Sequence, residues 1–232
     1  MKITAISTRI FHLNEDLVSF ITTHVKSLPE GSILLVTSKI ISLAEGQIVN
    51  HSETSKKDLV KKEADIVLCE SYKTYLTIKN NILIPAAGID ESNAEGKFYI
   101  LWPKDPYQSA KDLWLTTKTH YQIKKLGIIL TDSRCTPLRK GVSGVGISYW
   151  GFKGVDSHIG KPDIFNRPIV MSTTNIVDGL AAAGVLVMGE SNEQKPLALI
   201  ENFEAEFCDE VDPKELIMPP DQDIFGPVIK MN

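Results

Sequence analysis

The sequence contains little cysteine and no long hydrophobic segment. Its cysteines are odd in number and far apart, which excludes a disulfide framework and CxxC zinc spacing: Cys69, Cys135 and Cys208. The longest apolar segment, residues 179–189, is shorter than the roughly 20 residues that a membrane-spanning helix needs. The N-terminal segment reaches Glu15 and Asp16 before any long apolar run, so it lacks the pattern of a signal peptide. We therefore expect a soluble, cytoplasmic protein with no membrane partner.

Clustered positive charge is also missing. The formal net charge is −4, and the 25 Lys and Arg residues are scattered along the chain, which argues against a nucleic-acid surface built on phosphate contacts. The five histidines share no close spacing, so we interpret them as structural or surface residues. Hydrophobic residues make up 43% and charged residues 23%, which are ordinary values for a chain that buries a core. A small anionic ligand in a local basic pocket is compatible with this composition.

Two common phosphate motifs are absent although glycine-rich segments are present. A P-loop needs GxxxxGK[ST], whereas five residues separate Gly154 from Gly160, and Pro162 stands where the hydroxyl residue would be. The dinucleotide fingerprint GxGxxG would need glycine at Tyr149, three positions after Gly146. The glycines therefore bind another group or simply turn the chain.

Hydrophobic periodicity predicts an alternation of strands and helices. Strands are expected at residues 3–10, 32–36, 98–102, 126–130, 168–172 and 197–200, with β-rich runs within 75–84 that break near Asn80 and Asn81. Helices are expected at residues 16–27, 38–45, 55–69, 106–125 and 175–187. The alternation favours an α/β fold, but the long polar insertions do not fit a regular doubly wound sheet, so we expect a mixed sheet.

The segment of residues 127–146 holds more chemically useful groups than any other part of the chain. Its sequence is GIILTDSRCTPLRKGVSGVG, in which an apolar run ends in Asp132 and Ser133 and a basic, glycine-rich stretch follows. A carboxylate and a hydroxyl can bind a hard cation, and nearby cations with bare backbone suit a phosphate. Asp and Ser are also common turn residues at strand ends. Cys135 has no recognisable histidine partner nearby, so we do not expect a nucleophile there.

Other oxygen-bearing residues follow strands and helices elsewhere in the chain. Asp90 and Asn93 lie in the loop GIDESN, and Glu190 follows the helix predicted at residues 175–187. Mg²⁺ and Mn²⁺ bind through one or two protein carboxylates together with nucleotide phosphates. Ser38 and Lys39 place a hydroxyl and a cation at a helix start that favours an anion, although a plain N-cap with a solvated lysine explains them equally well. Nucleotide chemistry is therefore the leading hypothesis.

Over about residues 3–203, the order of its segments makes the chain resemble the coenzyme F-420:L-glutamate ligase (F-420-0 γ-glutamyl ligase) family. The segments that carry the resemblance are TSKIISLAEG, GIDESN, LTDSRCTPLRKGVSGVGIS and DIFNRPIVMSTTNIVDGLAAAGVLVMGESNEQKPLALIENF. The resemblance implies a mixed α+β fold, with mixed sheets and helices in two interlocked lobes. Residues 1–205 would form this unit, and residues 206–232 would be a C-terminal extension.

The resemblance also implies an enzyme, a GTP- and divalent-metal-dependent γ-glutamyl ligase. Such an enzyme phosphorylates a substrate carboxylate, F-420-0-like or other, with the γ-phosphate of GTP, and the amine of L-glutamate then displaces phosphate from the acyl phosphate to form an amide. Mg²⁺ or Mn²⁺ would stabilise the charge that develops in both steps, and K⁺ is a further candidate ion. The family implies a homodimer with each active site near the subunit interface.

Site residues are carried over from the family at the matching positions, and no catalytic residue is assigned. The implied metal ligands are Asp90, Asp132, Ser133 and Glu190. The implied nucleotide contacts are Ser38, Lys39, Asn93 and a loop over the nucleotide made of Met188, Gly189, Glu190, Ser191, Asn192, Glu193, Gln194 and Lys195. Shared ligation of one metal needs carboxylate oxygens within roughly 5 Å of one another.

Several positions depart from the family pattern. Leu43 stands where the family usually has Lys, residues 134–136 replace a common Phe-Gly-Arg, and Leu138 replaces a common Trp. The acceptor is therefore either an F-420-0-like compound or a different carboxylate. These departures motivate an alternative, a catalytically inactive nucleotide-binding or regulatory homologue that would bind GTP without turnover. A purely structural protein would require Asp90, Asp132 and Glu190 to lie far apart.

Overall fold

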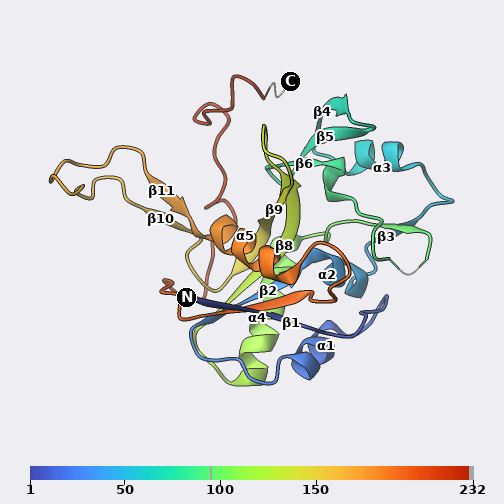
Figure 1. Cartoon of the computed structure of the whole chain (residues 1–232), viewed down its shortest axis with the longest axis horizontal. Coiled ribbons are helices and arrows are strands. Elements are labelled where there is room, and N and C mark those ends of the chain that lie inside the picture. Colours follow the sequence, from blue (N-terminus) through green and yellow to red (C-terminus); the bar gives the residue numbers. More distant parts are fainter. Residues whose placement is uncertain (95, 230–232) are drawn as a thin grey trace.

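The centre of the molecule is a five-stranded mixed sheet with the strand order β1-β12-β2-β8-β9 (Figure 1). The computed structural model describes residues 1–94 and 96–229. In sheet order, the strands are β1 (Lys2–Ile6), β12 (Leu197–Glu201), β2 (Ser32–Thr37), β8 (Leu126–Cys135) and β9 (Val142–Trp150). Strands β2 and β8 are parallel, and the other neighbouring pairs are antiparallel. The expected mixed sheet is confirmed.

Helices cover both faces of this sheet because its central strands carry apolar runs, residues 33–36 on β2 and 128–130 on β8, whose side chains are buried on both sides. On β2, Leu34 and Val36 pack into one core and Ile33 and Leu35 into the other, since successive side chains of a strand point to opposite faces. The first core also holds residues of α1 (Leu17–His24), α2 (Ser38–Ala44) and α4 (Pro106–Tyr121). The second core is closed by α5 (Ile176–Met188), which crosses the sheet in Figure 1.

A smaller lobe beside the sheet is formed by residues 48–94 and 96–100. Its elements are β3 (Ile48–Asn50), α3 (Lys56–Glu63), β4 (Ile66–Ser71), β5 (Thr74–Lys79), β6 (Ile82–Pro85), the short 3-10 helix η1 (Ala86–Gly88) and β7 (Phe98–Ile100). The break at Asn80 and Asn81 is confirmed, and both residues have positive φ. The helix predicted over residues 55–69 is wrong in its second half. It ends at Glu63, and the alternating exposure of residues from Ile66 onward belongs to a strand paired with β5.

The glycine-rich segment after Asp132 is part of strand β9. A side chain at Gly144 would lie 2.4 Å from the Ala181 backbone oxygen of α5, and one at Gly146 would lie 2.3 Å from a methyl carbon of Val177. These two glycines therefore allow α5 to pack directly on the strand. They lie within a paired strand, which corrects the expectation that these glycines turn the chain.

Strand β8 is longer than predicted and carries Asp132 and Ser133 within it. The prediction ended the strand at Leu130, but pairing with β9 continues to Cys135 through a β-bulge between Leu130 and Thr131. A bulge adds one residue on the partner strand and locally reorients side chains. Asp132 and Ser133 are therefore held by a paired strand rather than by a loop.

The remaining differences concern the edge strand β1, the end of α4 and the β10–β11 hairpin. The first strand ends at Ile6, and α4 ends at Tyr121, where Gln122 adopts a left-handed conformation. The strand predicted at residues 168–172 is found instead at β11 (Thr173–Asn175), which pairs with β10 (Val155–Ser157). This hairpin forms the arm that projects from the body in Figure 1. Within the described residues, no helix is both long and apolar enough to cross a bilayer.

Candidate functional site

A pocket of about 820 Å³ opens where the parallel pairing of β2 with β8 ends. Thr37 is paired with Thr131 at this edge. Lys39 follows the end of β2 on α2, and Asp132 follows Thr131 on β8. Ligands of α/β sheets commonly bind beyond the carboxyl ends of parallel strands. The pocket is closed by residues of the smaller lobe and by the loop that follows α5.

Every site residue carried over from the sequence lines this one pocket. On one side lie Ser38, Lys39, Asp90 and Asn93, and on the other lie Asp132, Ser133 and residues 188–195. Residues of four separate chain segments thus meet at one place. In the following, "the β8 wall" means Asp132, Ser133 and Glu190, and "the loop wall" means residues 90–93 together with Lys39.

Asp132 is the most electrostatically unusual group of the β8 wall. Its carboxylate accepts hydrogen bonds from the Trp102 indole N–H and from the Ser133 backbone N–H, the latter at 2.7 Å. Burial raises the pKa of Asp132 to about 6, and the two hydrogen bonds offset the burial only in part. Asp90 raises this pKa further and Lys39 lowers it, so the loop wall lies within electrostatic reach of Asp132. A carboxylate in this state favours a proton or a cation.

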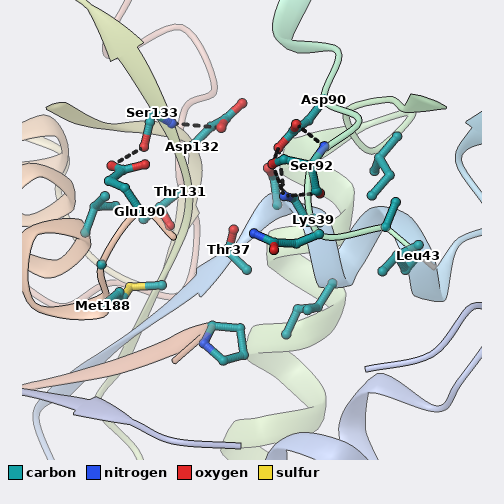
Figure 2. A pocket seen from close by; sticks show the side chains of 18 of the residues that line it. Thr37, Lys39, Leu43, Asp90, Ser92, Thr131, Asp132, Ser133, Met188 and Glu190 are labelled. Carbon is teal, nitrogen blue, oxygen red and sulfur yellow. Dashed lines mark hydrogen bonds and ion pairs between the residues drawn. The ribbon is translucent and has the colours of Figure 1, made fainter. Parts of the chain in front are cut away.

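The other members of the β8 wall bind each other. The Ser133 hydroxyl donates to a Glu190 carboxylate oxygen at 2.7 Å (Figure 2). Glu190 follows Gly189, whose φ of 88° lies in the left-handed region and ends helix α5. The hydrogen bond therefore ties the loop after α5 to the central strand β8. It also brings two of the implied metal ligands into direct contact.

The loop wall is built around Asp90. Its Oδ1 accepts the backbone N–H groups of Glu91 at 2.6 Å and Ser92 at 2.7 Å. Its Oδ2 lies 2.7 Å from the Lys39 ammonium nitrogen. Burial alone would raise the pKa of Asp90, but the Lys39 ammonium and the bonds from Ser92 outweigh burial and hold the pKa below its ordinary value. Figure 2 shows Asp90 and Asp132 facing one another across the pocket.

The two walls are joined at one side of the pocket. The side-chain amide of Asn93 donates to the Ser191 backbone oxygen at 2.8 Å. Ser191 is itself held by its own backbone N–H, which donates to Glu193 at 2.8 Å. The loop of residues 188–195 is thus attached both to β8, through Ser133, and to the smaller lobe, through Asn93.

Sequence reasoning missed several residues of this pocket. Trp102, Ser92 and Thr131 line it, and Trp102 and Ser92 make hydrogen bonds to the two aspartates. Trp102 was visible only as the last residue of a predicted strand. The indole ring also fills the space over Gly88, where a side chain would lie 2.3 Å from the ring. A contact between residues 30 positions apart leaves no local pattern in the sequence.

The departures from the family pattern fall both inside and outside the pocket. Leu43 and Cys135 line it, and Leu43 belongs to its apolar end together with Ile84 and Ile100. Arg134 instead pairs with Asp178 at 3.0 Å, and Leu138 is fully exposed at the β8–β9 turn. Of these positions, Leu43 and Cys135 are therefore the ones placed to affect what the pocket binds.

The pocket offers oxygen donors on two walls rather than one compact cluster. Within residues 1–94 and 96–229, no three His, Cys, Asp or Glu side chains are grouped closely enough to hold a metal ion. The donors nevertheless fit a hard divalent cation in chemical type, since all are carboxylate or hydroxyl oxygens. Asp132, which lacks a direct cationic partner among its hydrogen bonds, is the donor that such an ion would stabilise most.

Comparison with known proteins agrees with this architecture. Residues 5–202 match the family described as F420-0:Gamma-glutamyl ligase, and the chain belongs to this family. The mixed α+β fold is that expected for the family.

The chain is similar to three archaeal proteins named coenzyme F420:L-glutamate ligase. It is 35% identical over 147 residues to that of Methanococcus maripaludis, which covers 63% of this chain and 58% of the relative. It is 30% identical over 174 residues to that of Methanocaldococcus jannaschii, covering 73% and 64%, and 28% identical over 172 residues to that of Methanopyrus kandleri, covering 72% and 68%. The chain thus spans a little over half of the length of the first of these relatives.

Proposed function

We propose that the protein is a GTP- and divalent-metal-dependent ligase that joins a substrate carboxylate to the amine of L-glutamate. The observation that carries this proposal is the single pocket in which Asp90, Asp132, Ser133 and Glu190 meet, in a chain of this family. The names of the relatives support glutamate as one substrate.

In the proposed reaction, an oxygen of the acceptor carboxylate attacks the γ-phosphorus of GTP and GDP leaves. The amine nitrogen of glutamate then attacks the acyl carbon, phosphate leaves, and the amine loses a proton as the amide forms. Mg²⁺ or Mn²⁺ would be held by Asp132, Ser133, Glu190 and Asp90, and when bound it would stabilise phosphoryl charge. K⁺ is a further proposed ion.

The residues of the chain have separable tasks in this proposal. Trp102 orients the Asp132 carboxylate through its N–H. Ser38, Lys39 and Asn93 contact the nucleotide, and residues 188–195 cover it and exclude water. The apolar end around Leu43 and Ile84 would receive a flat, weakly polar part of the nucleotide or of the acceptor.

We also propose a cytoplasmic homodimer. The arm between β10 and β11 exposes large apolar side chains that a second copy of the chain would cover. Phe165 is 71% exposed, Val170 76% and Met171 85%.

One experiment tests the function directly. Purified protein is given GTP, Mg²⁺ or Mn²⁺, L-glutamate and an F-420-0-like or other carboxylate acceptor, and released phosphate and amide product are measured, with ATP in parallel. The proposal predicts phosphate release that depends on metal, acceptor and glutamate. The absence of both phosphate release and nucleotide binding under all of these conditions would contradict the proposal.

A second candidate is an inactive nucleotide-binding homologue. The observation that favours it is Leu43, which brings an apolar side chain into the pocket where the family usually has a cation. This candidate predicts GTP binding without release of phosphate in the same assay. Sustained turnover would exclude it.

A further inference from the structure

The Asp90 carboxylate has no free position for a metal ion. An ionised carboxylate offers about four lone-pair sites. The Oδ1 of Asp90 accepts two backbone N–H groups. Its Oδ2 contacts the Lys39 ammonium at 2.7 Å and accepts the Ser92 hydroxyl at 3.0 Å. A metal can therefore reach Asp90 only after one of these donors leaves.

Lys39 is the donor that can leave. The backbone N–H groups on Oδ1 belong to the same short turn as Asp90, so a metal could replace them only if that turn rearranged. The Ser92 hydroxyl can rotate away, but the Lys39 ammonium would still lie 2.7 Å from Oδ2, and its charge would oppose a cation there. Lys39 comes from α2 and reaches Asp90 at the end of a flexible four-carbon stem. Its ammonium also lies 2.8 Å from the Ser92 backbone oxygen and 3.2 Å from the Ser92 hydroxyl. Three acceptors thus match its three N–H groups.

Asp132 across the pocket is in the opposite condition. Among the residues that the structure describes, only the Trp102 and Ser133 N–H groups donate to its carboxylate, which has lone pairs left for a further partner. The two facing aspartates therefore differ in their capacity to bind a metal ion: Asp132 can accept a further cation, whereas Asp90 is already paired with the Lys39 ammonium.

We propose that Lys39 is an internal counter-cation that competes with the divalent metal for Asp90 and is displaced when the metal binds. This inference rests on the proposed function, because it assumes that a divalent metal enters the pocket. Once displaced, the ammonium stays in the pocket as a cation for the phosphate oxygens of the nucleotide. Metal binding and nucleotide binding are thereby coupled through one side chain.

The coupling has a signature that a simple nucleotide contact lacks. If Lys39 competes with the metal, its removal strengthens metal binding in the absence of nucleotide. The same removal weakens nucleotide binding, because one phosphate contact is lost. A lysine that only contacts phosphate would leave metal binding unchanged, and a lysine that only supports the fold would weaken both.

The test is Mn²⁺ binding to the full chain without nucleotide, measured by the electron paramagnetic resonance signal of free Mn²⁺. The variants are Lys39→Met and Lys39→Gln, the second of which keeps a polar side chain in case the first folds poorly. The matched control is Lys56→Met. The Lys56 ammonium also binds this loop, through an ion pair with the Glu91 carboxylate at 3.0 Å, but Lys56 does not line the pocket.

The expected result is Mn²⁺ affinity about tenfold higher in the Lys39 variants than in the wild type, the size of one competing charge-assisted bond, and unchanged affinity in Lys56→Met. GTP affinity in the presence of Mn²⁺ should fall in the Lys39 variants. Mn²⁺ affinity that is equal or lower in folded Lys39 variants overturns the inference. If the wild type nevertheless releases phosphate from GTP, only the competition proposed here fails. If the wild type neither binds GTP nor releases phosphate from it, the proposed function itself is refuted.

Discussion

The β8 wall and the loop wall place an aspartate each into the same pocket, yet the two carboxylates differ in charge environment. Asp132 has a pKa raised to about 6 because burial dominates, whereas Asp90 has a pKa below its ordinary value because Lys39 and the hydrogen bonds from Ser92 together outweigh burial. The residue type alone therefore says little about what a carboxylate in this pocket will do. The balance between burial, the hydrogen bonds that each carboxylate accepts and the distance to Lys39 decides its pKa.

The two walls also differ in how they are held. The β8 wall stands on a central strand whose partner β9 is packed against α5 without intervening side chains at Gly144 and Gly146. The loop wall is held by hydrogen bonds within one turn and by Lys39. We therefore expect the β8 wall to be rigid and sensitive to packing, and the loop wall to rearrange when ligands bind.

The largest expected effect is on the proposed activity. Asp132→Asn removes the charge of the β8 wall but keeps an oxygen that can accept from Trp102, so phosphate release from GTP should fall about 10³-fold. The measurement is metal-dependent phosphate release at saturating GTP. Asp112→Asn, on the exposed side of α4, is the control and should be active. Equal rates in the two variants would show that the β8 wall is not the reacting side of the pocket.

The packing behind the β8 wall gives the next effect. Gly144→Ala would place a methyl group 2.4 Å from the Ala181 backbone oxygen, so α5 must shift and the free energy of unfolding should fall by about 3 kcal/mol. Gly179→Ala on α5 meets no atom within 4 Å and should stabilise by about 0.5–1 kcal/mol. Urea denaturation measures both. A Gly144→Ala variant as stable as the wild type would contradict the claim that close packing of α5 on β9 makes the β8 wall rigid.

A smaller effect concerns pH. Because the pKa of Asp132 rises from 3.8 to about 6 on folding, the native state binds a proton more tightly, and stability is lost as pH rises through this interval. Asp132→Asn should remove that loss. The change in the free energy of unfolding that the substitution causes should therefore be about 2 kcal/mol more favourable at pH 7.5 than at pH 4. Denaturation curves at the two pH values test this difference. An effect of Asp132→Asn that is the same at both pH values would show that folding does not raise the pKa of Asp132.

The smallest effect isolates one hydrogen bond. Trp102→Phe removes the N–H that Asp132 accepts and should cost about 1–2 kcal/mol at pH 7.5 and less at pH 4, where the carboxyl is protonated. Trp114→Phe is the matched control, because its N–H donates to the Leu126 backbone oxygen at 2.9 Å, which does not titrate. Its cost should be the same at both pH values. A pH-independent cost for Trp102→Phe would contradict the role given to this bond.

The central sheet could be predicted because its strands are continuous apolar runs. Residues 32–36, 126–130 and 197–200 were all found as strands, since apolar patterns report burial. The prediction failed where burial is partial. Residues 66–71 continue from α3 without a glycine or proline to mark the boundary, and their strand exists only because β5 pairs with it.

The site was predictable in its residues but not in its connections. Asp90, Asp132, Ser133 and Glu190 could be chosen by residue type and by resemblance, and all line the pocket. The Lys39–Asp90 ion pair joins positions 51 apart in the sequence, and the Trp102 bond to Asp132 depends on the packing of a lobe onto the sheet. No local pattern encodes either contact, so the opposite charge environments of the two walls appear only in three dimensions.

The most direct test of the account is the affinity for GTP measured with and without Mn²⁺, in the wild type and in Asp132→Asn. If the two walls form one metal-dependent nucleotide site, Mn²⁺ should tighten GTP binding to the wild type by about tenfold or more and should have little effect on Asp132→Asn. GTP binding that ignores Mn²⁺ in the wild type, or that Mn²⁺ strengthens equally in both proteins, would contradict this account.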